Sequence, residues 1–332
     1  MIAHRLYLSA LSVGIAGLLS GCSGSHRAEV GIPNVGSSSA RPHVSPQYRS
    51  FWTQKAPMPT ARYAFGVGVV NKILYAVGGN SGPLLTTVEA YDSATDSWTT
   101  KASMPTAREY LAVGVVNNIL YAIGGDDFFN VFNTVEAYDP ATDTWSTKAS
   151  MPTARRGFAV GIVNKMLYAV GGYNGSVLNT VEAYDPATNT WSTKAPMPTA
   201  RGGLAARSVN GILYAVGGAG AGLLSTVEAY DPTTNTWSTK ASMPTAREQL
   251  AAGVVNNLLY AIGGDNNYFD LQKVEAYNPV TNRWGTKAPL LAGRTLLGAG
   301  VANNVLYAVG GIGHIPNQDR TGNLNTLEAF TP

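Results

Sequence analysis

The sequence predicts an all-β repeat fold in which one four-stranded unit occurs six times. Two marks carry this prediction, a Gly-Gly pair and a tryptophan, and both recur at intervals of 46 or 47 residues. A fixed period of this length indicates supersecondary units that bury their apolar faces against one another. The pairs begin at Gly78, Gly124, Gly171, Gly217, Gly263 and Gly310, and the tryptophans are Trp52, Trp98, Trp145, Trp191, Trp237 and Trp284.

Each unit contains four short segments with the features of β-strands. In the second copy, apolar runs at residues 111–116 and 119–123 are separated by Asn117-Asn118. Asn tolerates the positive φ that a two-residue type I′ hairpin requires, so a tight antiparallel turn is expected there. A third strand is expected at residues 134–138, before an Asp-Pro turn, and a fourth carries the tryptophan. The first strands are rich in Gly, Ala and Val, which suits a crowded position near an axis.

The two ends of the chain predict that the repeats close into a ring. Residues 51–55 have the character of a fourth strand but precede any first strand, and the sixth unit ends after a third strand. The N-terminal strand is therefore expected to complete the last unit, which would leave no open sheet edge. An open solenoid is the alternative arrangement.

Units of about 46 residues, with Gly-Gly ending the second strand and Trp in the fourth, resemble Kelch repeats. The resemblance covers residues 50–332. It implies an all-β six-bladed β-propeller whose four-stranded antiparallel blades surround a central channel.

The region before the repeats has the features of a lipoprotein leader. An apolar run from Leu6 to Leu19 is too short to span a bilayer comfortably and fits the core of a signal peptide, expected over residues 1–21. Leu19-Ser20-Gly21-Cys22 resembles the lipobox of bacterial lipoproteins, which implies cleavage before Cys22 and acylation of that residue. Residues 22–49 would then form a lipidated, flexible tether rich in Ser, Gly and Pro.

The expected location follows from this leader. The chain would be lipid-anchored at the cell envelope, on the outer membrane or on an extracellular or periplasmic face, with the membrane contacted only through acylated Cys22. By the same resemblance, Ser23 favours outer-membrane sorting where the source has an outer membrane.

Composition and motifs argue against several other functions. The net charge is +3 and no Lys/Arg block is present, so no nucleic-acid partner is expected. Cys22 is the single cysteine, and His314 is the one histidine of the repeat region, so no metal site and no cofactor are predicted. A calcium site at Asp126, Asp127, Asp265 and Asp270 lacks EF-hand spacing.

Arginine and glutamate recur once in every unit. The arginines, at the start of each first strand, are Arg62, Arg108, Arg155, Arg201, Arg247 and Arg294, and the glutamates, in each third strand, are Glu89, Glu136, Glu182, Glu228, Glu275 and Glu328. Equal numbers of opposite charges in register favour structural pairs, because a partly buried charge needs a partner. The other interpretation is a ring of arginines at the channel mouth that binds carboxylates, as resemblance to Kelch propellers that bind acidic peptides implies.

The connections between second and third strands differ between units and are the other candidate binding surface. Strand alternation places them on the same rim as the segments leading into the arginines. Two of them combine aromatic side chains with Asp or Asn, a mixture typical of recognition surfaces. The candidate binding residues there are Asp126, Asp127, Phe128, Phe129, Asp265, Tyr268 and Phe269.

Two functions remain open. The leading hypothesis is a monomeric, non-enzymatic binding module that presents this rim to a protein or a carbohydrate. The alternative is a sugar epimerase or mutarotase, resembling periplasmic Kelch enzymes that act on sialic acid, with Glu109, Glu248 and Arg156 as unit-specific candidates for proton transfer and substrate binding.

Overall fold

The computed structural model describes residues 51–267, 270–314 and 321–332, and over these residues every secondary-structure element is a β-strand. The chain divides into two units, Met1–Pro46 and Gln47–Pro332, and the fold below belongs to the second. The predictions made for the leader, for Cys22 and for the tether lie outside the described residues. Within the described residues no helix is long and apolar enough to cross a membrane.

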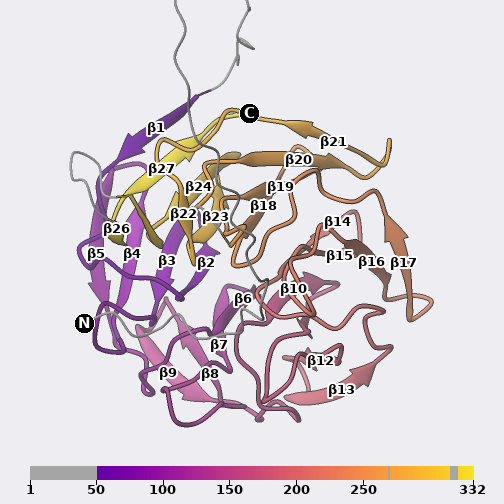
Figure 1. The fold of residues 1–332 in the computed structure, drawn as a ribbon. Coiled ribbons are helices and arrows are strands. Elements are labelled where there is room, and N and C mark those ends of the chain that lie inside the picture. The colour runs from indigo at the N-terminus through magenta and orange to yellow at the C-terminus, as the bar shows by residue number, and fades with distance from the viewer. Residues whose placement is uncertain (1–50, 268–269, 315–320) are drawn as a thin grey trace, which may run out of the picture. The chain divides into compact units, whose positions relative to one another are not determined.

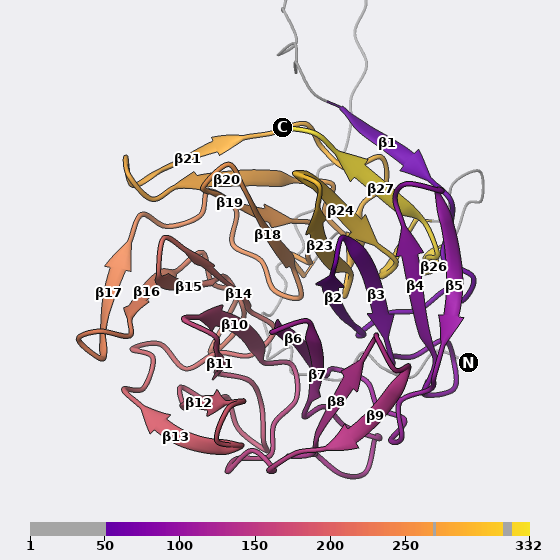
Figure 2. The same ribbon diagram turned by 180° about the vertical axis from the view of Figure 1, so that it is seen from behind.

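Six four-stranded antiparallel sheets are arranged radially as the blades of a propeller (Figures 1 and 2). This confirms the predicted six-bladed all-β architecture. Blade 1 consists of β2 (Gly66–Val70), β3 (Ile73–Val77), β4 (Val88–Asp92) and β5 (Ser97–Lys101). Blade 2 consists of β6 (Ala112–Val116), β7 (Ile119–Ile123), β8 (Val135–Asp139) and β9 (Thr144–Thr147). Blade 3 consists of β10 (Ala159–Val163), β11 (Met166–Val170), β12 (Val181–Asp185) and β13 (Thr190–Lys194). Blades 4 and 5 consist of β14 (Ala205–Val209), β15 (Ile212–Val216), β16 (Val227–Asp231) and β17 (Thr236–Lys240); and β18 (Ala251–Val255), β19 (Leu258–Ile262), β20 (Val274–Asn278) and β21 (Arg283–Thr286). Blade 6 consists of β23 (Gly298–Ala302), β24 (Val305–Val309), β27 (Leu327–Phe330) and β1 (Trp52–Lys55).

The first strand of each blade lies innermost, and neighbouring first strands contact one another in the cyclic order β2, β6, β10, β14, β18 and β23 (Figure 1). Small residues are required there because the blades converge. A Cβ atom added to Gly114 would lie 2.1 Å from Cδ2 of Leu167 in the next blade. The Gly, Ala and Val content of these strands therefore reflects close packing at the axis, as expected.

Turn geometry within the blades follows the sequence. Asn117 and Asn118 have φ values of 50° and 63°, which is the left-handed pair that a type I′ hairpin needs. The strands differ from the expected ranges by one residue: β6 begins at Ala112 and β8 spans Val135–Asp139. Strand ends are set by where backbone pairing begins and stops, which periodicity does not define to the residue.

The N-terminal strand completes the last blade, as predicted from the chain ends. β1 pairs antiparallel with β27, with Trp52 opposite Phe330 and Lys55 opposite Leu327. The Trp52 side chain is 4% exposed, and its ring stacks on Phe330 with 5.2 Å between centroids. The two ends of the repeat array thus meet within one sheet.

Every tryptophan also ties its blade to the preceding one. The indole Nε1 of Trp98 donates a hydrogen bond of 2.9 Å to the carbonyl of Ala56, which follows the outer strand of the preceding blade. The same bond occurs in all six blades, and Trp52 makes it to Ala288 at 3.0 Å. The tryptophan repeat is therefore a repeat of inter-blade contacts that closes on itself.

The connection between the second and third strands of blade 6 is longer than its counterparts and has a strand at each end. Its two ends form β25 (Ile312–His314) and β26 (Thr321–Asn323), which pair with each other, and β25 pairs with β22 (Arg294–Thr295). In the other five blades the same contact between the post-arginine residue and the connection is a single bridge. In blade 6 the longer connection extends that bridge into a small three-stranded sheet of β22, β25 and β26.

We predict that Trp52→Ala lowers the free energy of unfolding by about 3–5 kcal/mol, the usual cost of truncating a buried large aromatic side chain. The variant loses the stacking on Phe330 and the indole bond that together hold the ring closed. Phe51→Ala is the matched control, because Phe51 is 69% exposed. Denaturant unfolding measures both, and equal midpoints for the two variants would contradict closure by β1.

Candidate functional site

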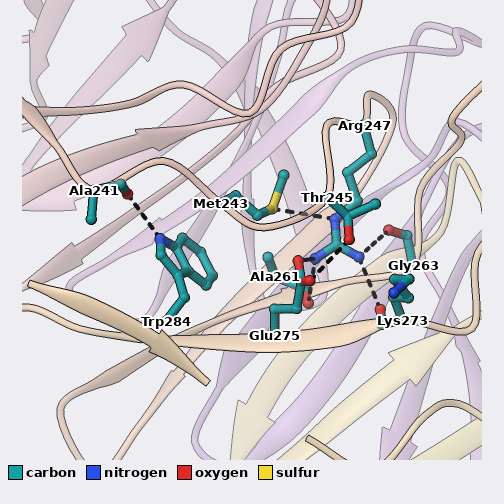
Figure 3. A network of polar contacts seen from close by, with 9 residues as sticks. All are labelled: Ala241, Met243, Thr245, Arg247, Ala261, Gly263, Lys273, Glu275 and Trp284. Carbon is teal, nitrogen blue, oxygen red and sulfur yellow. Dashed lines mark hydrogen bonds and ion pairs between the residues drawn. The ribbon is translucent and has the colours of Figure 1, made fainter. Parts of the chain in front are cut away.

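The recurrent arginines are buried in the scaffold of the blades. In blade 5, Nη2 of Arg247 lies 2.7 Å from Oε2 of Glu275, while Nη1 donates to the carbonyls of Gly263 and Lys273 at 3.2 and 3.1 Å (Figure 3). Desolvation lowers the pKa of Arg247 to about 10 even though Glu275 opposes the shift. The arginine thus remains charged at neutral pH and joins the start of its blade to the ends of the second and third strands.

All six arginine side chains are fully buried and each pairs with the glutamate of its own blade, the arrangement that the structural interpretation predicted. Five of the pairs have N–O distances of 2.6 to 2.8 Å, and the sixth is Arg294 with Glu328. Arg62, Arg108, Arg155, Arg201, Arg247 and Arg294 therefore offer no exposed guanidinium to a ligand, because burial in the blade takes up each one.

In five blades a threonine two residues before the recurrent arginine binds the same glutamate as that arginine. Oγ1 of Thr60 donates to Oε1 of Glu89 at 2.7 Å, so the threonine and the arginine bind the same carboxylate. The sixth unit has Ala292 in place of the threonine, and there the backbone N–H of Leu291 donates to Oε2 of Glu328 at 2.9 Å. Each glutamate accordingly has two kinds of partner in every blade.

The variable connections lie beside the segments that lead into the first strands, on one rim. In each of blades 1 to 5 the residue after the recurrent arginine bridges the first residue of the second-to-third connection. The bridged pairs are Tyr63 with Asn80, Glu109 with Asp126, Arg156 with Tyr173, Gly202 with Ala219, and Glu248 with Asp265. These positions vary between units, and only the Glu–Asp pair occurs twice, so this rim is where the chain departs from its own repeat.

A closed ring of backbone hydrogen bonds links the rim segments of neighbouring blades. The N–H of Tyr110 donates to the carbonyl of Ala64 at 2.7 Å, and the equivalent bond links every blade to its neighbour around the axis. The six residues of this ring all have positive φ and are Ala64, Tyr110, Gly157, Gly203, Gln249 and Leu296. Their side chains are therefore held at fixed positions around the channel mouth.

One group of rim residues combines an arginine with aromatic rings. Nη1 of Arg156 lies 2.7 Å from Oδ2 of buried Asp126, and the guanidinium carbon lies 5.9 Å from the ring centroid of Tyr110 and 5.4 Å from that of Tyr173. The Arg156 side chain is 33% exposed. We call Tyr110, Asp126, Arg156 and Tyr173 the Arg156 cluster.

Glu109 lies next to this cluster but is buried. Its Oε2 accepts a hydrogen bond of 2.9 Å from Nδ2 of Asn80, and its charge contributes, after desolvation, to raising the pKa of Tyr63 and of Tyr110. A carboxylate in this position supports the rim from within and is shielded from solvent.

The connection that begins at Asp126 is a tight, internally bonded loop with an apolar tip. Oδ1 of Asp126 accepts from the N–H of Phe128 at 3.2 Å, and Oδ1 of Asp127 accepts from the N–H of Asn130 at 2.7 Å. Phe128 is 48% exposed and Phe129 is 91% exposed. Turn formation therefore engages both aspartates and leaves the Phe129 ring in solvent.

Glu248 and Asp265 form a second group of rim residues. Desolvation raises the pKa of Glu248, and the neighbouring charge of Asp265 raises it further. A Cβ atom added to Gly203 would lie 3.0 Å from Oε2 of Glu248, so the glycine leaves room for this carboxylate. Tyr268 and Phe269, predicted from the same connection, lie outside the described residues.

Metal ligation receives no support within residues 51–267, 270–314 and 321–332, where no three His, Cys, Asp or Glu side chains are placed to hold an ion. His314 is exposed at the end of β25. Tyr110 and Tyr173 were missed by the sequence reasoning. A comparison of the residues that follow each recurrent arginine and each Gly-Gly pair would have identified them, because both are specific to one unit.

The comparison with protein families agrees with this architecture. The family described as the KLHDC2/KLHL20/DRC7 Kelch-repeats domain matches residues 48–218, just over half of the chain, and the Kelch motif matches residues 200–244 and 246–290. The chain belongs to the Kelch-repeat family. No curated protein matches it. Among solved structures, "Structure of YjhT" is similar with a TM-score of 0.69 and 19% identity, covering 80% of this chain and 99% of that one, which shows a shared fold.

We predict that Arg247→Met costs about 3–5 kcal/mol of stability, because it leaves Glu275 buried without its counter-charge. Adding Glu275→Gln to this variant should recover part of the loss, since the uncompensated charge is then removed. Urea denaturation of the wild type, both single variants and the double variant measures the coupling. Strictly additive losses would show that the pair is not energetically linked.

Proposed function

We propose that this chain is a non-enzymatic binding module that presents the rim of its propeller to a protein or glycan partner. The observation that carries the proposal is the Arg156 cluster: a partly exposed arginine held between two tyrosine rings, at a position where every other blade has a different residue. Arginine and tyrosine are the residue types that dominate binding energy at interfaces.

The chemistry of the cluster defines what it would bind. Asp126 and the two rings hold the guanidinium in one orientation, so little conformational entropy is lost when a partner's carboxylate or hydroxyl group contacts the exposed part of the side chain. The exposed Phe129 ring belongs to the loop that begins at Asp126 and would add an apolar contact beside this polar one. A partner with an acidic or hydroxyl-rich group next to an apolar one fits both features.

The proposed location is the cell envelope. Its support is the Leu19-Ser20-Gly21-Cys22 motif and the short apolar run before it. Acylation of Cys22 with more than one chain would anchor the protein stably, because each buried methylene contributes about 0.8 kcal/mol. The rim would then be displayed on a monomeric propeller at the end of a tether.

Capture of partners from a native envelope extract tests this proposal. The immobilised wild-type protein should retain a partner that the double variant Arg156→Ala, Phe129→Ala binds at least tenfold more weakly, because both contacts are removed. Val280→Ala is the matched control, since Val280 is an exposed apolar residue at the turn between β20 and β21. Equal retention by the rim variant would exclude this surface as the binding site.

A second function, a sugar epimerase or mutarotase, is favoured by one observation, the raised pKa of Glu248 at the rim. A carboxyl group that keeps its proton to higher pH can serve as a general acid. Screening sugars for mutarotation by NMR should then reveal a rate that falls as pH rises past the pKa of Glu248 and that Glu248→Gln abolishes. Asp265→Asn should shift that fall to lower pH. No turnover of any sugar would remove this candidate.

A further inference from the structure

The first strand of blade 4 breaks the repeat pattern at its most crowded position. Five blades have glycine at the middle of the first strand, and blade 4 has Arg207. In four of the five, an added Cβ atom would lie only 2.1 to 2.4 Å from a leucine methyl group of the next blade. The glycines are Gly68, Gly114, Gly161, Gly253 and Gly300. Packing alone thus favours glycine at this position, and blade 4 carries the largest cation instead.

The Arg207 side chain reaches across the channel. Nη1 donates to the carbonyl of Ala206 at 2.9 Å, and Nη2 donates to the carbonyl of Ala299 at 3.4 Å. Ala299 belongs to β23 of blade 6, so the guanidinium extends from β14 past the first strand of blade 5. Figure 1 shows these inner strands around the centre of the propeller.

The side chains around Arg207 are apolar, but most of the accessible surface of the cavity is polar and comes from Arg207 and from backbone groups. A cavity of about 130 Å³ at the axis is lined by residues of all six first strands and the residue preceding each, and Arg207 is the one charged residue among the described residues of this lining. Six of the lining side chains are bulky and surround the cavity: Phe65, Leu111, Phe158, Leu204, Leu250 and Leu297.

Arg207 is partly buried and differs from the recurrent, fully buried arginines in its partners. Each recurrent arginine has a glutamate in its own blade, whereas no carboxylate pairs with Arg207 within the part of the chain that the structure describes. Burial lowers its pKa to about 10, and no neighbouring negative charge raises it again. The group is therefore a partly buried cation at neutral pH, with two neutral carbonyl partners for its five N–H donors.

We propose that the central channel is a binding site for a small carboxylate, held by the guanidinium of Arg207. A carboxylate matches the planar fork of donors and supplies the negative charge that the site lacks. Formate and acetate are the simplest ligands of this class. This site lies within the ring of first strands and is independent of the Arg156 cluster.

Thermal stability in the presence of sodium acetate tests the proposal. The melting temperature of the full-length wild-type protein should rise with acetate concentration and saturate, because a ligand that binds the folded state stabilises it. Acetamide, which has the same shape and no charge, should have no effect. Sodium chloride and phosphate at matched ionic strength separate a carboxylate site from general anion binding.

Arg207→Gly is the matched variant, because it restores the residue that the other five blades carry and is compatible with folding. It should bind acetate at least tenfold more weakly by calorimetry. Arg207→Met keeps the side-chain bulk without the charge and should behave in the same way, and Arg207→Lys should bind with intermediate affinity because it retains the charge without the fork.

Three results would overturn the proposal. The first is an acetate response that is unchanged in Arg207→Gly. The second is a response of the wild type to chloride or phosphate that equals or exceeds the response to acetate, and the third is the absence of any response in the wild type.

Discussion

Closure of six blades around one axis is the constraint on which the rest of the structure depends. It is made by one strand pairing, β1 with β27, and by six indole bonds, each from a tryptophan to the preceding blade. Backbone bonds at the rim form a second closed ring. Since each set is cyclic, the series of blades has no free end in the described fold, and the rim positions are fixed relative to one another.

Comparison of the six repeats distinguishes residues of the scaffold from residues of a candidate site by the contacts that they make. A residue identical in all six units, such as the arginine or the tryptophan, makes the same buried contact six times. A residue specific to one unit has no equivalent contact in the other units, so its presence must be explained by its own surroundings. Arg156 and Arg207 are both of this kind, and they are also the two arginines discussed above that retain solvent-accessible surface.

The arginines differ in role because their charges are neutralised by different partners. The recurrent arginines are fully buried and paired with glutamate, an arrangement whose net contribution to stability is small but whose disruption is costly. Arg156 is partly exposed, forms an ion pair with Asp126 and lies against two aromatic rings. Arg207 has only carbonyl partners within the described residues, in a channel lined by apolar side chains. The same side chain therefore acts as a structural clamp, as an oriented surface group, or as an uncompensated charge, according to what surrounds it.

The sequence by itself determined the number of blades, the strands within them, the hairpin turns and the strand that closes the ring, because each of these depends on local spacing that recurs six times. It also predicted the Arg–Glu pairs, since equal and opposite charges in register leave few other arrangements. Only the tertiary structure decided that these arginines are fully buried, that Arg156 lies between Tyr110 and Tyr173, and that the last connection forms a small sheet with β22. Those outcomes depend on which residues of different blades meet at the rim and on how closely strands converge at the axis. Side-chain exposure and contacts between neighbouring blades are properties of the closed ring, and a linear pattern does not contain them.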